Sequence, residues 1–202
     1  AYNPETGERI WRFNTIPGPG EPGSETWPDD PDVLARGGGG TWMNGSYDPE
    51  LDLIYWGVGN PNPDYYGDDR AGDNLYSNSI VALDAQTGTL RWHYQFTPHD
   101  VNDWDSNQIP VLADIDWQGE PRKVVMLANR NGFFYVMDRA TGELLLGKPF
   151  TATTWARELD ENDRPIVLND GSQGCVPDPW GSTNFMPPSF YQELGLFILT
   201  AR

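Results

Sequence analysis

"ALDAQTGTLRWHYQF" (82–96) contains a turn motif that recurs along the chain. "AYNPETGERIWRF" (1–13) and "VMDRATGELLLGKPF" (136–150) follow the same pattern. In each, a β-like run reaches Asp or Asn, a turn ends in Thr-Gly, and a large side chain follows four residues after the glycine. Asp or Asn and Gly provide the polar corner and the positive φ of such a turn. The large residue, which is Trp11, Trp92 or Leu146, is expected to pack between neighbouring sheets.

The spacing of the turn glycines predicts the fold. Gly88 and Gly142 are 54 residues apart, whereas Gly7 and Gly88 are 81 apart. Removing the Gly- and Pro-rich stretch 14–40, which is 27 residues long, restores the spacing of 54. A period near 50 that contains several strands and turns is typical of β-propeller blades. We therefore expect an all-β chain that forms part of a β-propeller.

Each period contains four predicted strands. In the clearest period they span 42–47, 53–59, 79–85 and 90–96. Strong helical periodicity is absent. Residues 1–202 are then one partial propeller domain, which comprises the end of a blade (1–13), two whole blades (41–96 and 97–150) and the start of the next blade (184–202).

Three long segments connect these elements: 14–40, 60–78 and 151–182. Long connections often carry function or cover a site. The chain has no starting Met, begins inside a turn motif and ends inside a predicted strand. We expect it to be an internal piece of a longer protein.

The composition narrows the classes of partner. A net charge of −17 argues against nucleic acid and anionic membranes, but leaves metal cations and neutral small molecules open. The single cysteine, Cys175, excludes an internal disulfide and is expected to be a small buried residue. No apolar run reaches the length of a membrane span.

The stretch "HDVNDWDSNQ" (99–108) crowds Asp100, Asp103 and Asp105 around one tryptophan. Carboxylates this close repel one another, so the arrangement costs stability unless a positive group lies among them. A bound cation would be one such group.

Several motifs together resemble those of the alcohol dehydrogenases that use pyrroloquinoline quinone (PQQ), which are eight-bladed propellers with tryptophan-docking turns. They are "GGGGTWMNGSYDPELDLIYWGVGNPNPD", "RAGDNLYSNSIVALDAQTGTLRWHYQFTPHD" and "NRNGFFYVMDRATGELL". The resemblance covers nearly the whole chain and is weakest over 14–36 and 151–174. It implies about two whole blades plus parts of two others.

The resemblance implies three cofactor-binding residues. Trp42 would lie flat under the planar quinone, Arg130 would bond and polarise the reactive quinone oxygens, and Asn184 would contact the cofactor. Without the family resemblance, Trp42 could equally be a core residue of a β-blade, and Arg130 could equally be a surface residue at the start of a strand.

The resemblance also implies a metal site for Ca²⁺ or a lanthanide ion. Asn60 and Asp103 would be ligands, with Asp103 also the catalytic general base for the substrate hydroxyl. Asp105 would be the additional ligand that marks lanthanide-using members, although some sugar-oxidising relatives share this Asp-x-Asp. Asn60 alone also suits an Asn-Pro turn, and Asp105 alone also suits a solvated loop. His99 and Asp100 are assigned structural roles.

The implied function is oxidation of a primary alcohol to an aldehyde, with a small alcohol as substrate, a cytochrome c as electron acceptor and a periplasmic location. The family's metal-binding Glu and its paired cysteines belong upstream of Ala1, so we expect an incomplete site and an inactive fragment. Two alternatives stay open: a non-catalytic quinoprotein-like scaffold and a PQQ sugar dehydrogenase. "GNPNPD" followed by "GDNLY" resembles the alcohol enzymes more closely.

Overall fold

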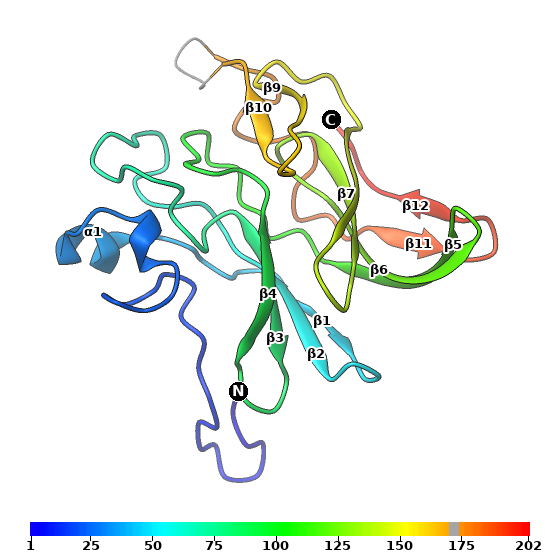
Figure 1. Cartoon of the computed structure of the whole chain (residues 1–202), viewed down its shortest axis with the longest axis horizontal. Coiled ribbons are helices and arrows are strands. Elements are labelled where there is room, and N and C mark those ends of the chain that lie inside the picture. Colours follow the sequence, from blue (N-terminus) through cyan, green and yellow to red (C-terminus); the bar gives the residue numbers. More distant parts are fainter. Residues whose placement is uncertain (170–173) are drawn as a thin grey trace.

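Antiparallel sheets dominate the structure, a computed structural model that describes residues 1–169 and 174–202 (Figure 1). The first four-stranded sheet has the order β1-β2-β3-β4 and contains β1 (Ser46–Asp48), β2 (Leu53–Gly57), β3 (Ser79–Asp84) and β4 (Leu90–Gln95). The second has the order β5-β6-β7-β8 and contains β5 (Val111–Trp117), β6 (Glu120–Ala128), β7 (Phe133–Asp138) and β8 (Leu144–Pro149). In both sheets consecutive strands are neighbours, as in a propeller blade.

Smaller pieces of sheet stand at both ends of the chain. Near the C-terminus β11 (Ser189–Tyr191) pairs with β12 (Leu196–Ile198), and near the N-terminus Tyr2 forms an isolated bridge with Arg9. The all-β class predicted from the repeat is therefore confirmed. Among the described residues no helix is long and apolar enough to cross a membrane.

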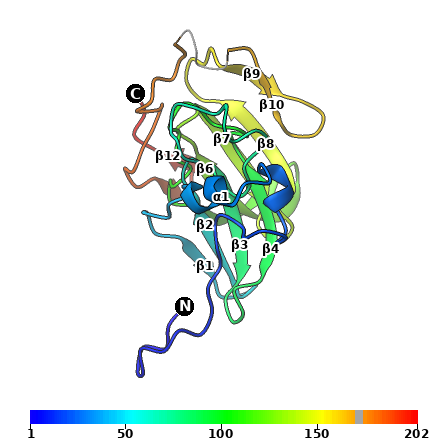
Figure 2. The same cartoon turned by 90° about the vertical axis from the view of Figure 1, so that its left-hand side faces the viewer.

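Two of the long connections hold structure that the sequence did not predict. Segment 14–40 contains a short 3₁₀ helix, η1 (Ser24–Thr26), and one turn and a half of helix, α1 (Pro31–Arg36). Asp30 caps α1 by accepting a hydrogen bond from the Asp32 amide, and Pro31 occupies its first turn. Segment 151–182 contains a hairpin of β9 (Ala156–Leu159) and β10 (Pro165–Val167). Figure 2 shows α1 in front of the first sheet and β9–β10 beyond one end of the strands.

The prediction of a strand beginning at Trp42 is wrong, because β1 begins only at Ser46. The glycine run before Trp42 is used differently. Gly39 donates to the Asn60 carbonyl at 2.9 Å, and the Gly40 carbonyl accepts from the Gly59 amide at 2.8 Å. These contacts hold the run across the end of β2, so Trp42 lies in a loop.

The recurring turns dock one sheet onto the next, as the motif predicts. The Trp11 indole lies against Gly88 and donates to the Ala85 carbonyl at 3.0 Å. Trp92 repeats this arrangement: its indole lies against Gly142 and donates to the Arg139 carbonyl at 3.2 Å, and Arg139 is 54 residues after Ala85. Both glycines have positive φ, and a Cβ on either would collide with the indole.

The core between the two four-stranded sheets is largely aromatic. It includes Tyr55 from the first sheet, Phe96 directly after β4, and Phe133 and Tyr135 from the second sheet, all fully buried. The buried Arg139 guanidinium also reaches back to Asp48 at 2.6 Å. The third turn residue, Leu146, is part of a separate apolar cluster that includes Phe190 and Phe197 of β11 and β12.

Candidate active site

The loop 98–110 between β4 and β5 holds the three clustered aspartates, and Asp100 turns into the protein. Its carboxylate accepts from the Trp104 amide at 2.8 Å, the Asn102 amide at 2.9 Å and Asn78 Nδ2 at 3.1 Å. Burial raises the pKa of Asp100 to about 6, against the lowering effect of these hydrogen bonds. Asp100 thus holds the shape of the loop, the structural role expected from the sequence.

Arg130 supplies a positive charge among the other two aspartates. It lies in the tight turn between β6 and β7, and its side chain is 7% exposed. Nη1 donates to Asp105 Oδ2 at 2.8 Å, and Nη2 lies 3.8 Å from Asp103 Oδ2. Nη2 also donates to the Pro179 carbonyl. A buried guanidinium that bridges two carboxylates offsets the repulsion between them.

Asn60 meets the same group of residues from the end of the first sheet. Its backbone amide donates to Asp105 Oδ1 at 3.2 Å, and its side-chain Nδ2 donates to Asp64 Oδ1 at 2.8 Å. These contacts orient the side-chain amide, and no hydrogen bond within the described ranges uses Asn60 Oδ1. That oxygen is the atom through which Asn60 could bind a cation.

Asp103 combines an unusual backbone conformation with a perturbed carboxylate. It has a φ of 61°, a left-handed conformation unusual for a residue with a side chain. The Tyr65 hydroxyl donates to its Oδ2 at 3.2 Å. Burial raises the pKa of Asp103, and the charges of Asp105 and Asp64 act in the same direction, while Arg130 opposes them. A raised pKa favours proton acceptance by this carboxylate at neutral pH.

Trp42 and Asn184 lie on the two loops that border this group. Trp42 is 48% exposed and follows Gly40, whose carbonyl accepts from Asn107 Nδ2 at 3.1 Å. Asn184 is nearly buried, donates to the Trp180 carbonyl at 3.0 Å and accepts from the Phe185 amide at 2.9 Å. Its loop reaches the site where the Ser182 amide donates to the Arg130 carbonyl. Sequence-distant residues therefore converge, with Asn60, Asp103, Asp105 and Arg130 at the centre.

Sequence reasoning missed Tyr65 and Asp64, which contact Asp103 and Asn60 respectively. Only their position in a long connecting segment could have indicated from the sequence that they belong to the site. Both lie in the 60–78 segment, directly after the Asn-Pro-Asn-Pro run.

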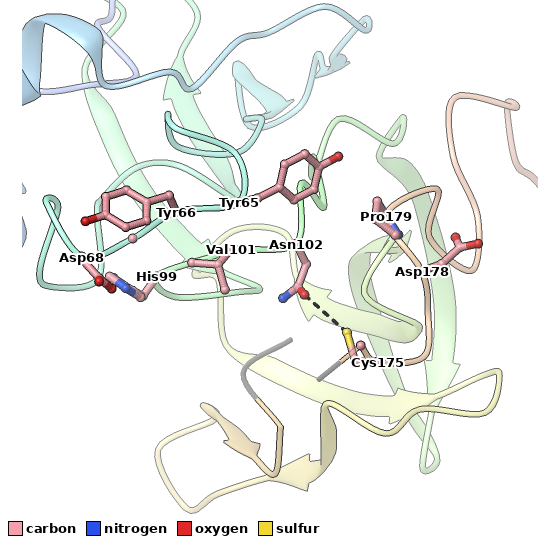
Figure 3. Close-up of a pocket in the computed structure, with 11 residues that line it drawn as sticks. Tyr65, Tyr66, Asp68, His99, Val101, Asn102, Cys175, Asp178 and Pro179 are labelled. Atoms are coloured by element: carbon pink, nitrogen blue, oxygen red, sulfur yellow. Dashed lines mark hydrogen bonds between the residues drawn. The ribbon is translucent and has the colours of Figure 1, made fainter. Parts of the chain in front are cut away.

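The sequence reasoning also missed a cavity of about 520 Å³ beside these residues, bordered by 65–68, 99, 101–102, 174–175 and 178–179 (Figure 3). The expectation that Cys175 is buried is wrong. It is half-buried in this wall, and its thiol donates to Asn102 Oδ1 at 3.3 Å.

The donor atoms fit a hard cation in kind but not in number. Carboxylate oxygens of Asp103 and Asp105 and the amide oxygen of Asn60 are ligand types that Ca²⁺ accepts, but such an ion takes roughly six to eight oxygens. Across residues 1–169 and 174–202 there is no group of three or more His, Cys, Asp and Glu side chains that could hold a metal. A cation at this position would need further oxygen ligands.

Comparison with known proteins defines the class of this chain. A family model described as the β-propeller domain of PQQ glucose, ethanol and alcohol dehydrogenases matches residues 1–149, so the chain belongs to this PQQ dehydrogenase family and forms part of its β-propeller.

Individual relatives agree. A quinohemoprotein alcohol dehydrogenase of Comamonas testosteroni is 42% identical over 100% of this chain and 31% of the relative. A crystal structure of the quinohemoprotein alcohol dehydrogenase from that organism has a TM-score of 0.91 and 41% identity, and the match covers 99% of this chain and 32% of the other. A lanthanide-dependent methanol dehydrogenase of Methylacidiphilum fumariolicum is 36% identical over 98% of this chain and 36% of the relative. The chain thus spans about a third of the length of these relatives.

Proposed function

We propose that this chain is part of an enzyme that oxidises a primary alcohol to an aldehyde with PQQ and a metal ion. The observation that carries the proposal is the convergence of Asn60, Asp103, Asp105 and Arg130 from separate parts of the chain. A propeller that serves only as a scaffold has no need for a strained, partly buried carboxylate beside a buried guanidinium. Membership in the PQQ dehydrogenase family supports the same conclusion.

Each residue of the group has a role in this proposal, and the role of Asn184 comes from the family resemblance. Asp103 accepts the hydroxyl proton of the alcohol at its carboxylate, with Tyr65 and Arg130 holding that carboxylate in place. Arg130 and Asn184 bind the cofactor, and the exposed face of Trp42 supports its rings. Asn60, Asp103 and Asp105 provide oxygen ligands for Ca²⁺ or a lanthanide ion. When bound, PQQ supplies the two-electron acceptor and the metal supplies Lewis acidity.

The wider setting belongs to the same proposal. A small alcohol is the substrate, a cytochrome c accepts the electrons, and the enzyme works in the periplasm. The names of two relatives, both quinohemoprotein alcohol dehydrogenases, support an alcohol substrate and electron transfer that involves a haem.

The test uses the full-length protein reconstituted with PQQ and either Ca²⁺ or La³⁺, with reduction of an artificial dye as the readout. Primary alcohols should be oxidised, and Asp103→Asn should lower kcat by at least about 100-fold, the usual contribution of a general base. Asp116→Asn is the matched control, because Asp116 is an exposed acid near the far end of β5. Absence of alcohol oxidation, or an Asp103→Asn variant within about twofold of wild type, would overturn the proposal. Oxidation of glucose in place of alcohols would select the sugar dehydrogenase alternative.

A further inference from the structure

The cavity in Figure 3 adjoins the proposed site through three of its wall residues. Tyr65 forms part of the wall and donates its hydroxyl to Asp103 Oδ2. Asn102, another wall residue, directly precedes Asp103 in the chain. The carbonyl of Pro179, a third wall residue, accepts a hydrogen bond from Arg130. A molecule whose hydroxyl reaches Asp103 could therefore place the rest of its structure in this cavity.

The size and walls of the cavity favour a particular organic group. A volume of about 520 Å³ lies within the range of ligand pockets and is much larger than a methyl or ethyl group requires. Tyr65, Tyr66, Val101 and Pro179 offer ring faces and aliphatic surface. Such walls suit a flat or branched apolar group the size of a ring, which gains free energy from the apolar area that it buries.

The exposed charged side chains that line the cavity are acidic. Asp68 and Asp178 both line it and are exposed, and Asp103 is in contact with the wall residue Tyr65. Asp178 forms an ion pair with Arg202 at 3.8 Å, and this exposed pair is screened by salt. A carboxylate on the substrate would therefore be repelled where a neutral substrate of the same size is not.

We propose that this cavity holds the organic group of the alcohol, and that it selects neutral, ring-sized alcohols over both ethanol and hydroxy acids. The inference rests on the proposed function for the placement of the hydroxyl at Asp103. The cavity itself, however, is a binding site whose occupancy can be measured without turnover.

Two pairs of variants in the full-length protein test the proposal. Val101→Phe fills the cavity, and Val176→Phe is its control, because Val176 is a half-exposed valine that does not line the cavity. Asp68→Asn removes one negative charge from the rim. Its control is Asp69→Asn, since the neighbouring Asp69 lies outside the lining and 3.8 Å from Arg36.

The readouts are binding and turnover. Ligand-observed NMR measures binding of benzyl alcohol to the protein without any need for catalysis. Steady-state kinetics give kcat/KM for ethanol, benzyl alcohol and 4-(hydroxymethyl)benzoate. We expect Val101→Phe to weaken benzyl alcohol binding and to lower the benzyl alcohol to ethanol ratio of kcat/KM by about tenfold or more, a usual effect of a misfit in an apolar pocket. Asp68→Asn should raise the relative kcat/KM of the benzoate by roughly threefold at low salt. Val176→Phe should leave the benzyl alcohol to ethanol ratio unchanged, and Asp69→Asn should leave the relative kcat/KM of the benzoate unchanged.

Each outcome separates the two proposals. Alcohol turnover with a substrate ratio unchanged by Val101→Phe would overturn the cavity assignment and leave the proposed function standing. Benzyl alcohol binding that Val101→Phe weakens, without turnover of any alcohol, would support the cavity and overturn the proposed function. Benzyl alcohol binding that Val101→Phe does not weaken, or no binding at all, would overturn the cavity assignment. Equal kcat/KM for benzyl alcohol and the benzoate in wild type would overturn the charge selection.

Discussion

The Arg139 carbonyl receives two hydrogen bonds from the neighbouring sheet, and this arrangement makes a quantitative prediction. Trp92 Nε1 donates to it at 3.2 Å and the Tyr55 hydroxyl at 2.7 Å. Tyr55 is fully buried and Trp92 is 8% exposed, so water cannot easily replace either donor. The prediction concerns three variants: Trp92→Phe, Tyr55→Phe and the double variant that carries both substitutions.

The magnitudes follow from what each variant leaves behind. A single substitution removes one hydrogen bond, worth about 0.5–1.5 kcal/mol, while the carbonyl keeps its other donor. Trp92→Phe also loses ring volume against Gly142, so its cost should be the larger of the two. The double variant leaves a buried carbonyl with neither donor, which adds a desolvation penalty of about 1–3 kcal/mol. The double variant should therefore lose more stability than the sum of the two single variants.

Urea denaturation of the full-length protein measures this coupling, with tryptophan fluorescence and circular dichroism compared to check that the transition is two-state. The control cycle combines Trp11→Phe with Tyr55→Phe, because Trp11 donates to a different acceptor, the Ala85 carbonyl. That pair should be additive within about 0.5 kcal/mol. If the loss of unfolding free energy in the Trp92→Phe, Tyr55→Phe double variant also equals the sum of the two single losses, the claim that the shared carbonyl couples the two sheets is refuted.

Three further predictions concern the metal, the pH dependence and the isolated chain. Asp105→Ala should lower alcohol oxidation with La³⁺ far more than with Ca²⁺, because a trivalent ion at contact gains on the order of several kcal/mol from a carboxylate even at an effective dielectric near 20; an unchanged metal preference would exclude Asp105 as a ligand. The folded-state pKa of Asp100 lies above its unfolded value, so wild type should gain stability relative to Asp100→Asn as the pH falls from about 6 to about 4. Urea titrations at several pH values measure this difference, and a loss of stability relative to Asp100→Asn over that range would contradict the prediction. Residues 1–202 alone should associate or melt without a sharp transition, since apolar side chains such as Ile10, Leu196 and Ile198 are exposed; a cooperative melt of a monomer in analytical ultracentrifugation would contradict this.

The strands and the docking turns can be predicted from the amino-acid sequence. Both depend on local chemistry: the strands on short apolar runs, and the turns on Asp or Asn followed by Gly with positive φ. Because the motif repeats with one period, the indole of one turn meets the glycine of the next, as Trp11 and Trp92 show. The family motifs also predict that Asn60, Asp103 and Arg130 belong to one site.

The assembly of that site depends on tertiary contacts that the sequence pattern does not reveal. The pairing of Arg130 with Asp105, the hydrogen bond from Tyr65 to Asp103 and the cavity between three loops each join residues far apart in sequence. Local periodicity carries no information about them, because they depend on how neighbouring sheets are rotated and on the paths of long connections. The hairpin β9–β10 escaped prediction for a related reason: its strands are short, partly exposed and lie inside a connection. Contacts of this kind are set by the packing of sheets against one another, and a single strand or turn does not encode that packing.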